Sequence, residues 1–303
     1  NVDCVIESVD VNTIYDVPNH MYRECLDKVA LKKLKLDYNE PDLDSWNNFL
    51  DKYKNPKDTI KIALIGKYVE LQDSYKSILE SFIHAGAVNE VDVDVIPLHS
   101  EFINSENVHD KLQSFNGILV APGFGERGVE GKIEAIKYVR LNNIPFFGIC
   151  YGMQMAVIEY ARNMLKLDDA NSTEVNPNTK NPVIDLMEEQ KNITEKGGTM
   201  RLGAWKCDIT RETLCHSVYK TENIEERHRH RYELNNKYLN QLEENGLVAS
   251  GKNKDTNLVE VVEVKEHPWF IGVQYHPEYK STVLSPHPLF VSFVSAAILN
   301  KNK

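Results

Sequence analysis

The sequence lacks any run of about 18 consecutive apolar residues, the length that a membrane-spanning helix requires. Its N-terminal region also lacks an apolar signal core, so the sequence argues against membrane and secreted proteins. Cysteine is scarce, and the few cysteines form no Cys-x-x-Cys pair. They are Cys4, Cys25, Cys150, Cys207 and Cys215. An odd number without paired spacing argues against a disulfide framework or a zinc knuckle, and favours a reducing compartment such as the cytoplasm.

Positive charge is also in short supply. The chain has 35 lysines and arginines against 45 aspartates and glutamates, which gives a net charge of −10. This balance argues against a protein that wraps nucleic acid. The other proportions are ordinary for a globular chain, with 42% hydrophobic and 26% charged residues. A length of 303 residues allows one large domain or two smaller ones.

The first part of the chain differs in composition from the rest. It begins without methionine in strand-like alternation over residues 2–6, which we interpret as a piece of something longer. A helix is predicted over residues 21–36. Residues 37–58 are polar and contain two prolines, so we interpret them as a linker that holds one short amphipathic helix around Trp46.

Strands and helices alternate from residue 59 onward. Strands are predicted at 60–65, 91–97, 117–121 and 145–149, and helices at 74–85, 132–142 and 153–165. The later part is richer in strands, at 207–210, 229–234, 248–251, 258–264 and 270–274, and closes with a helix at 289–299. The predicted fold is α/β, with a mostly parallel central sheet flanked by helices and added antiparallel strands in the C-terminal half.

The sharpest chemical feature is a Gly-x-Cys-x-Gly turn where a buried strand meets a helix. Gly148 and Gly152 flank Cys150 in the pattern of a nucleophile elbow, with a thiol in place of a hydroxyl. The glycines allow a sharp turn, and the N-terminus of the following helix favours thiolate over thiol. The alternative interpretation is a buried structural cysteine, which is the usual fate of a lone thiol.

A thiolate nucleophile needs a proton donor, and His276 is the best candidate. It follows the predicted strand 270–274, and active sites of open parallel sheets collect at the carboxyl ends of strands. Glu278 lies two residues further and could orient the imidazole, as in other triads. The alternative is a capping histidine in a turn, since His-Pro pairs also occur at His267 and His287.

A glycine-rich loop at residues 121–128 follows another predicted strand. It lacks the Gly-Lys-Ser/Thr ending or the G-x-G-x-x-G pattern of a phosphate-binding loop. Its better use is to offer the Gly123 N–H to a developing oxyanion, together with the N–H of Tyr151. A flexible surface loop is the alternative.

Residues 226–232 form the densest basic run. Read as a strand, the run places its arginines on one face and its histidines on the other; these are Arg227, Arg229 and Arg231 against His228 and His230. No third zinc ligand is evident, and one short run in an acidic chain argues against nucleic acid. A row of guanidinium groups suits carboxylate recognition, and the alternative is a solvated, salt-bridged face.

Together these segments resemble the class I (triad-type) glutamine amidotransferase domain of CTP synthases. The matching strings are residues 66–71, 123–131, 148–154, 171–174, 197–203, 226–233, 267–270 and 276–278. The elbow and the His-Pro-Glu string occur across class I amidotransferases. The strings Gly-Gly-Thr-Met-Arg-Leu-Gly and Glu-Arg-His-Arg-His-Arg-Tyr point to CTP synthases in particular.

This resemblance implies roles for individual residues. Cys150 would be the nucleophile, His276 the general acid/base and Glu278 its orienting group, with no metal. L-Glutamine would contact Gly123, Tyr151, Gly152, Met153, Gln154, Glu174 and Arg231. Glu174 would pair with the substrate ammonium, and the Arg231 region would hold the α-carboxylate. Two positions depart from the family pattern, since Pro122 and Tyr151 stand where the family usually has glycine and leucine.

The resemblance also implies partners. In the whole family enzyme the released ammonia reaches a synthetase domain, which uses ATP and Mg to aminate UTP to CTP in pyrimidine biosynthesis. GTP activates the glutaminase half, near the loop of residues 123–131. By the same resemblance, residues 1–36 are the C-terminal remnant of the synthetase (amidoligase) domain, 37–58 a linker and 59–303 the amidotransferase domain. Two other functions stay open: a glutamine-binding regulatory module that is silent without GTP and the synthetase domain, and a related γ-glutamyl hydrolase.

Overall fold

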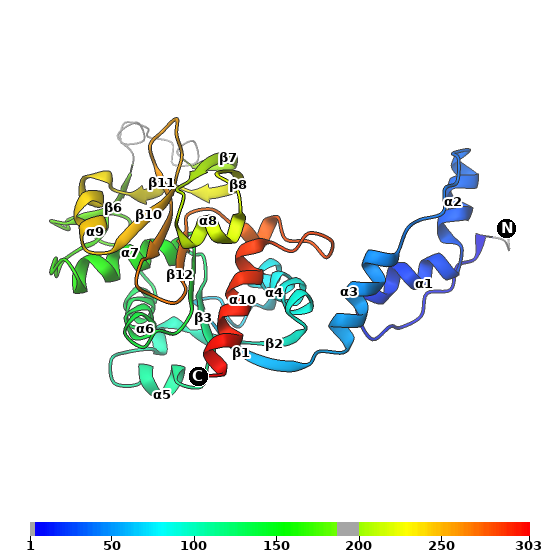
Figure 1. Ribbon diagram of the computed structural model, residues 1–303, viewed down its shortest axis with the longest axis horizontal. Coiled ribbons are helices and arrows are strands. Elements are labelled where there is room, and N and C mark those ends of the chain that lie inside the picture. The colour runs from blue at the N-terminus through cyan, green and yellow to red at the C-terminus, as the bar shows by residue number, and fades with distance from the viewer. Residues whose placement is uncertain (1–3, 187–199) are drawn as a thin grey trace.

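The computed structural model describes residues 4–186 and 200–303. They form a large α/β body from which an N-terminal segment of helices projects (Figure 1). Residues 197–199 of the Gly-Gly-Thr-Met-Arg-Leu-Gly string lie outside the described residues, as do residues 1–3 of the predicted N-terminal alternation.

In the described parts of the chain, nine strands form the central sheet of the body. In spatial order they are β2 (Val91–His99), β1 (Asp58–Gly66), β3 (Gly117–Val120), β4 (Phe146–Ile149), β12 (Phe270–Val273), β11 (Val259–Val264), β10 (Leu247–Lys252), β7 (Arg201–Ile209) and β8 (Asn223–His230). The first five pair in parallel and the last four are joined by antiparallel pairings. The predicted fold class is confirmed.

Helices cover both faces of this sheet. Alternate apolar side chains of β1 point to opposite faces, so each face needs helices to bury it. Ile62 and Leu64 join one core with α4 (Lys76–Asn89) and α10 (Pro288–Lys301), which lie side by side in Figure 1. Ala63 and Ile65 join the other core with α5 (Val108–Leu112), α6 (Val129–Leu141) and α7 (Tyr151–Asn163). Helices α6 and α7 begin two or three residues earlier than predicted.

A second, smaller sheet contains β5 (Asn171–Ser172), β6 (Pro182–Leu186) and β9 (Tyr232–Leu234). The prediction of one strand over residues 229–234 is wrong. β8 ends at His230 in the large sheet and β9 begins at Tyr232 in the small one, so Arg231 stands at the corner where the chain changes sheets.

The N-terminal segment contains α1 (Val17–Arg23), α2 (Leu26–Leu34) and α3 (Asp44–Lys54). The predicted single helix over 21–36 is wrong because the backbone breaks at Cys25, whose φ of 57° is left-handed. Residues 4–13 form no strand, since no neighbouring strand pairs with them. The helix predicted in the linker is α3, and its Phe49 packs with Tyr15 and with Ala87 of α4.

Short elements complete the described chain. They are the helices α8 (Leu214–Tyr219) and α9 (Leu239–Glu244), and 3₁₀ turns at Ile14–Asp16, Gln72–Tyr75, Ser100–Phe102, Asn236–Tyr238 and Pro277–Tyr279. Across residues 4–186 and 200–303, we find no helix with both the length and the apolar character needed to cross a membrane.

Candidate active site

Cys150 occupies the turn between β4 and α7 in a strained backbone conformation, with φ 52° and ψ −101°. The flanking glycines are required by close packing. A Cβ on Gly148 would lie 2.8 Å from the Gly152 carbonyl carbon, and a Cβ on Gly152 would lie 2.2 Å from the Val120 oxygen. The predicted elbow geometry is therefore present, and it places the thiol at the N-terminus of α7.

The thiol is buried rather than displayed on the surface, with Cys150 only 5% exposed. Its backbone N–H donates to the Val273 carbonyl at 2.7 Å, which ties the elbow to the end of β12. The Gln274 amide nitrogen lies 3.8 Å from the sulfur. The same glutamine accepts a bond from the Gln154 amide at 3.2 Å, so a buried amide pair flanks the thiol.

His276 follows β12 and reaches the cysteine. Its Nδ1 donates to Glu278 at 2.7 Å, and this contact leaves Nε2 available to Cys150. Burial alone would lower the pKa of His276, but the negative charges of Cys150 and Glu278 outweigh burial and raise it to about 11. The His276 ring also stacks on Tyr279, with ring centroids 5.1 Å apart.

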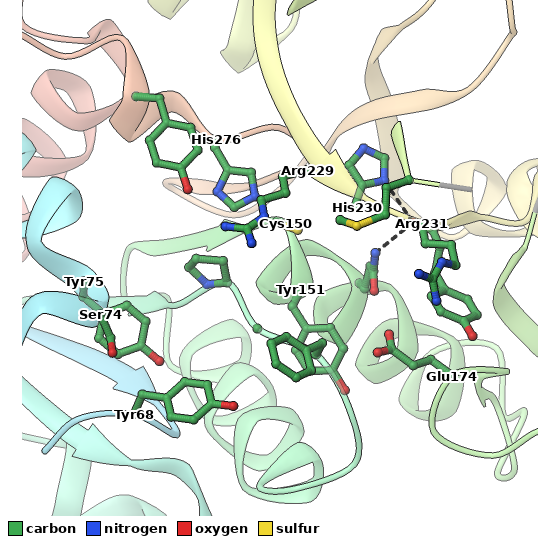
Figure 2. A pocket seen from close by; sticks show the side chains of 17 residues that line it. Tyr68, Ser74, Tyr75, Cys150, Tyr151, Glu174, Arg229, His230, Arg231 and His276 are labelled. Carbon is green, nitrogen blue, oxygen red and sulfur yellow. Dashed lines mark hydrogen bonds between the residues drawn. The ribbon is translucent and has the colours of Figure 1, made fainter. Parts of the chain in front are cut away.

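These groups open onto a cavity of about 480 Å³ (Figure 2). Seven of the predicted site residues line it: Gly123, Cys150, Tyr151, Gln154, Glu174, Arg231 and His276. Three do not. Gly152 and Met153 are buried in the first turn of α7, and Glu278 binds Nδ1 of the imidazole. The sequence analysis missed other lining residues, which are Tyr68, Ser74, Tyr75, Pro122, Phe124, Met200, Arg229, His230, Tyr232 and Tyr279.

Glu174 and Arg231 place a negative and a positive charge at one end of the cavity. Figure 2 shows the two side chains facing the same space, and the charge of Arg231 acts on the Glu174 carboxyl. Burial raises the pKa of Glu174 above its usual value, against the opposing effects of the Gly125 N–H and Arg231. The Gly125 N–H donates to Glu174 at 2.9 Å. A carboxylate beside a guanidinium can hold the ammonium and carboxylate of an α-amino acid.

The basic run has the two predicted faces only as far as His230, because Arg231 lies beyond the end of β8. Arg227 and Arg229 are exposed along β8, while His228 and His230 point inward. Arg229 lines the cavity, so the run is more than a solvated face. In the described residues no group of three or more His, Cys, Asp or Glu side chains is arranged to hold a metal ion.

A buried ionic cluster behind the cavity was not predicted. Arg201 on β7 lies 2.6 Å from Glu260 and 3.7 Å from Glu233. Burial raises the pKa of Glu260 to about 7, against the opposing charge of Arg201, and raises that of Glu233 well above its usual value. His228 and His230 complete this cluster, with their facing nitrogens 2.8 Å apart. The alternation of residue types along β8 places His228 and His230 on one face, but no sequence pattern connects them with Arg201, Glu233 and Glu260.

Comparisons with known proteins agree with this geometry. The family model "Glutamine amidotransferase class-I" matches residues 70–296. The CTP synthase of Christiangramia forsetii is 65% identical over 296 residues, which cover 97% of this chain and 54% of that protein. The CTP synthase of Flavobacterium johnsoniae is 66% identical over 297 residues, covering 98% of this chain and 55% of that protein. The chain thus spans about half the length of these relatives.

A solved structure gives the same result. The glutaminase domain of Trypanosoma brucei CTPS with bound acivicin matches with a TM-score of 0.75 and 37% identity, over 79% of this chain and 94% of that one. The chain therefore belongs to the glutamine amidotransferase class-I family, as a glutaminase domain of the CTP synthase type.

Proposed function

We propose that Cys150, His276 and Glu278 hydrolyse L-glutamine to glutamate and ammonia through a γ-glutamyl thioester. The observation that carries the proposal is the Cys150 thiol in a strained elbow beside a carboxylate-bound imidazole. Both groups open onto one cavity with Glu174 and Arg231.

Binding comes first. Glu174 accepts the substrate ammonium and Arg231 pairs with the α-carboxylate, which directs the γ-carboxamide toward Cys150. Gln154 and the backbone of the elbow line the path between them. The burial of Gly152 and Met153 in the first turn of α7 means that any contact they make with glutamine uses backbone atoms.

Chemistry then proceeds in two halves. The Cys150 thiolate attacks the γ-carbonyl carbon, the new C–S bond forms, and the oxygen takes the electron pair as an oxyanion. The N–H groups of Gly123 and Tyr151 stabilise that charge. His276 gives the Nε2 proton to the leaving nitrogen as the C–N bond breaks and ammonia departs. Water then attacks the thioester, His276 takes its proton, and cleavage of the C–S bond releases glutamate and the thiolate.

The role of the whole protein is a further part of the proposal. In the whole protein, residues 1–36 belong to a synthetase (amidoligase) domain, residues 37–58 are a linker and residues 59–303 form the amidotransferase domain. The ammonia serves amination of UTP to CTP with ATP and Mg, and GTP activates the glutaminase. The similarity of the chain to CTP synthases supports this role. The free cysteines of the described chain support the cytoplasm as its compartment.

The test is release of ammonia and glutamate from glutamine by the chain and by Cys150→Ala, each with and without GTP. We expect release by the unmodified chain and none by the variant. Cys4→Ala is the matched control. It removes an exposed free thiol far from Cys150 in the sequence and should retain full activity. Ammonia release by Cys150→Ala would contradict the proposal.

The same assay separates the two alternatives. A regulatory module would bind glutamine but release no ammonia until GTP and the synthetase domain are present. A γ-glutamyl hydrolase would instead prefer γ-glutamyl peptides over free glutamine, which a substrate panel would reveal.

A further inference from the structure

The loop that carries Gly123 lies against the side chains of Tyr151, Lys132 and Lys67, which the proposed mechanism does not use. The Tyr151 hydroxyl donates to the Gly125 carbonyl at 2.5 Å. A Cβ placed on Gly123 would lie 3.8 Å from Tyr151 Cδ1 and 3.7 Å from Lys132 Nζ. The side chains of Tyr151 and Lys132, together with that of Lys67, therefore border the space beside the Gly123 α-carbon.

Lys132 is an unusual neighbour for this loop. It lies in α6 and is fully buried, and within the described residues its Nζ has no hydrogen-bond acceptor. The ammonium instead lies over the Tyr151 ring, 4.8 Å from its centroid. Burial, with smaller contributions from the nearby charges of Lys67 and Arg127, lowers the pKa of Lys132 to about 7. Burying a cation with no neighbouring anion costs free energy of folding. Its position near Gly123 therefore indicates that Lys132 has a function there.

Tyr151 links the two halves of the oxyanion site. Its own N–H is one of the two donors of the proposed mechanism, and its phenol reaches across to the loop that carries the other donor. A second hydrogen bond holds the loop at the same residue, because the Gly125 N–H donates to Glu174. Lys132 packs below the ring, where attraction between a cation and an aromatic face fixes the ring position.

We propose that Tyr151 and Lys132 are positioning residues that hold the Gly123 N–H and the Tyr151 N–H in one rigid oxyanion site. This inference rests on the proposed glutaminase activity. The two donors come from different segments, the β3–α6 loop and the start of α7, so their spacing needs a cross-link. The phenol supplies that link, and the Lys132 side chain packed over the ring keeps the phenol in place.

The test uses two conservative variants. Tyr151→Phe keeps the ring but removes the hydroxyl, and Lys132→Met keeps the length of the side chain but removes the charge. We expect kcat for glutamine to fall by about tenfold in each, with KM nearly unchanged, because oxyanion contacts strengthen in the transition state. Since the two residues act as one unit, the double variant should lose less than the product of the two single losses.

Two probes of Cys150 separate positioning from general damage. Glutamate γ-semialdehyde adds to the thiol as a hemithioacetal, whose oxygen would occupy the oxyanion site. Iodoacetamide alkylates the thiol with loss of iodide and forms no oxyanion. We expect semialdehyde affinity to fall by about the same factor as kcat/KM, whereas the alkylation rate stays unchanged.

Tyr160→Phe is the matched control, since it removes another α7 phenol that donates to a backbone carbonyl, that of Asn245. It should leave semialdehyde affinity unchanged. Unchanged affinity in both Tyr151→Phe and Lys132→Met would overturn the inference, as would equal losses with both probes. An unmodified chain that neither hydrolyses glutamine nor binds the semialdehyde would overturn the proposed function itself, and the inference with it.

Discussion

Two sets of buried histidines lie around this cavity, and their surroundings drive them to opposite charge states. The pKa of His276 is raised to about 11, whereas the pKa values of His228 and His230 are lowered to about 2 and about 3. All three side chains are nearly inaccessible to water. Burial disfavours the charged form in every case, so burial cannot explain the difference.

The neighbours explain it. His276 meets a carboxylate at 2.7 Å and the Cys150 sulfur, both of which favour the imidazolium. His228 and His230 also face carboxyl groups, Glu260 at 3.6 Å and Glu233 at 3.3 Å, but burial raises the pKa of both carboxyls and so weakens their negative charge. The nearby Arg201 guanidinium then disfavours a further positive charge on either imidazole. The same residue type therefore becomes a proton donor in one place and a neutral structural group in the other.

Among variants that alter this difference between His276 and the other two histidines, Cys150→Ala has the largest expected effect. Glutamine turnover should fall by at least about 10³-fold, because the nucleophile is lost. The pKa of His276 should also fall, since the thiolate helps to hold its proton, while those of His228 and His230 should move little. Histidine NMR titration checks this expectation. An unchanged His276 titration would mean that the thiol and imidazole do not interact.

Glu278→Gln removes the other group that favours the imidazolium. The pKa of His276 should fall and its orientation should loosen, so we expect turnover to drop by about 10²-fold or more. The alkaline limb of the pH–rate profile should move to lower pH, because the imidazolium that protonates the leaving nitrogen is lost earlier. A lower rate with an unmoved alkaline limb would contradict the role given to Glu278.

Arg201→Met tests the other side of the comparison. It leaves Glu233 and Glu260 buried without their cation, so we expect a loss of about 3–5 kcal/mol in the free energy of unfolding. Denaturant unfolding measures this loss. Arg211→Ala, which breaks an exposed pair with Glu222, is the control and should change stability little. Equal effects of the two variants would show that the buried cluster does not stabilise the fold.

The last prediction concerns the pH dependence of stability. Because His228 has a lowered pKa in the folded chain, unfolding takes up a proton below pH about 6.5, and stability is lost as the pH falls toward about 2. His276 has a raised pKa, so its contribution is complete below pH about 6.5 and is lost as the pH rises through about 11. His228→Asn should therefore lose less stability on acidification than the unmodified chain. Unfolding curves at a series of pH values would refute this if the two chains lost stability in parallel.

The sequence could predict what depends on local pattern. The elbow needs glycines two residues on either side of Cys150, and the His-Pro-Glu string follows directly on a strand, so both were visible as short motifs. The parallel part of the sheet followed from alternating strands and helices. Glu174 and Arg231 were placed by resemblance, and the structure brings both to the same cavity.

The parts that sequence reasoning missed depend on packing between distant segments. Arg201, Glu233 and Glu260 come from three strands, and no local pattern marks them as partners. The breaks at Cys25 and Arg231 also lack a glycine or proline at the break itself. From the sequence we predicted only that a helix starts at Lys132 and that Tyr151 acts through its backbone. The contact between their side chains exists only after α6 packs on α7, so no local pattern could reveal it.

The central claim is that glutamine hydrolysis passes through a covalent bond to Cys150, and acid quenching during turnover followed by peptide mass spectrometry tests it most directly. The account predicts a γ-glutamyl thioester on the peptide that contains Cys150, which forms with substrate and disappears when glutamine is exhausted. Steady ammonia release with no adduct on that peptide, or with the adduct on another residue, would contradict it.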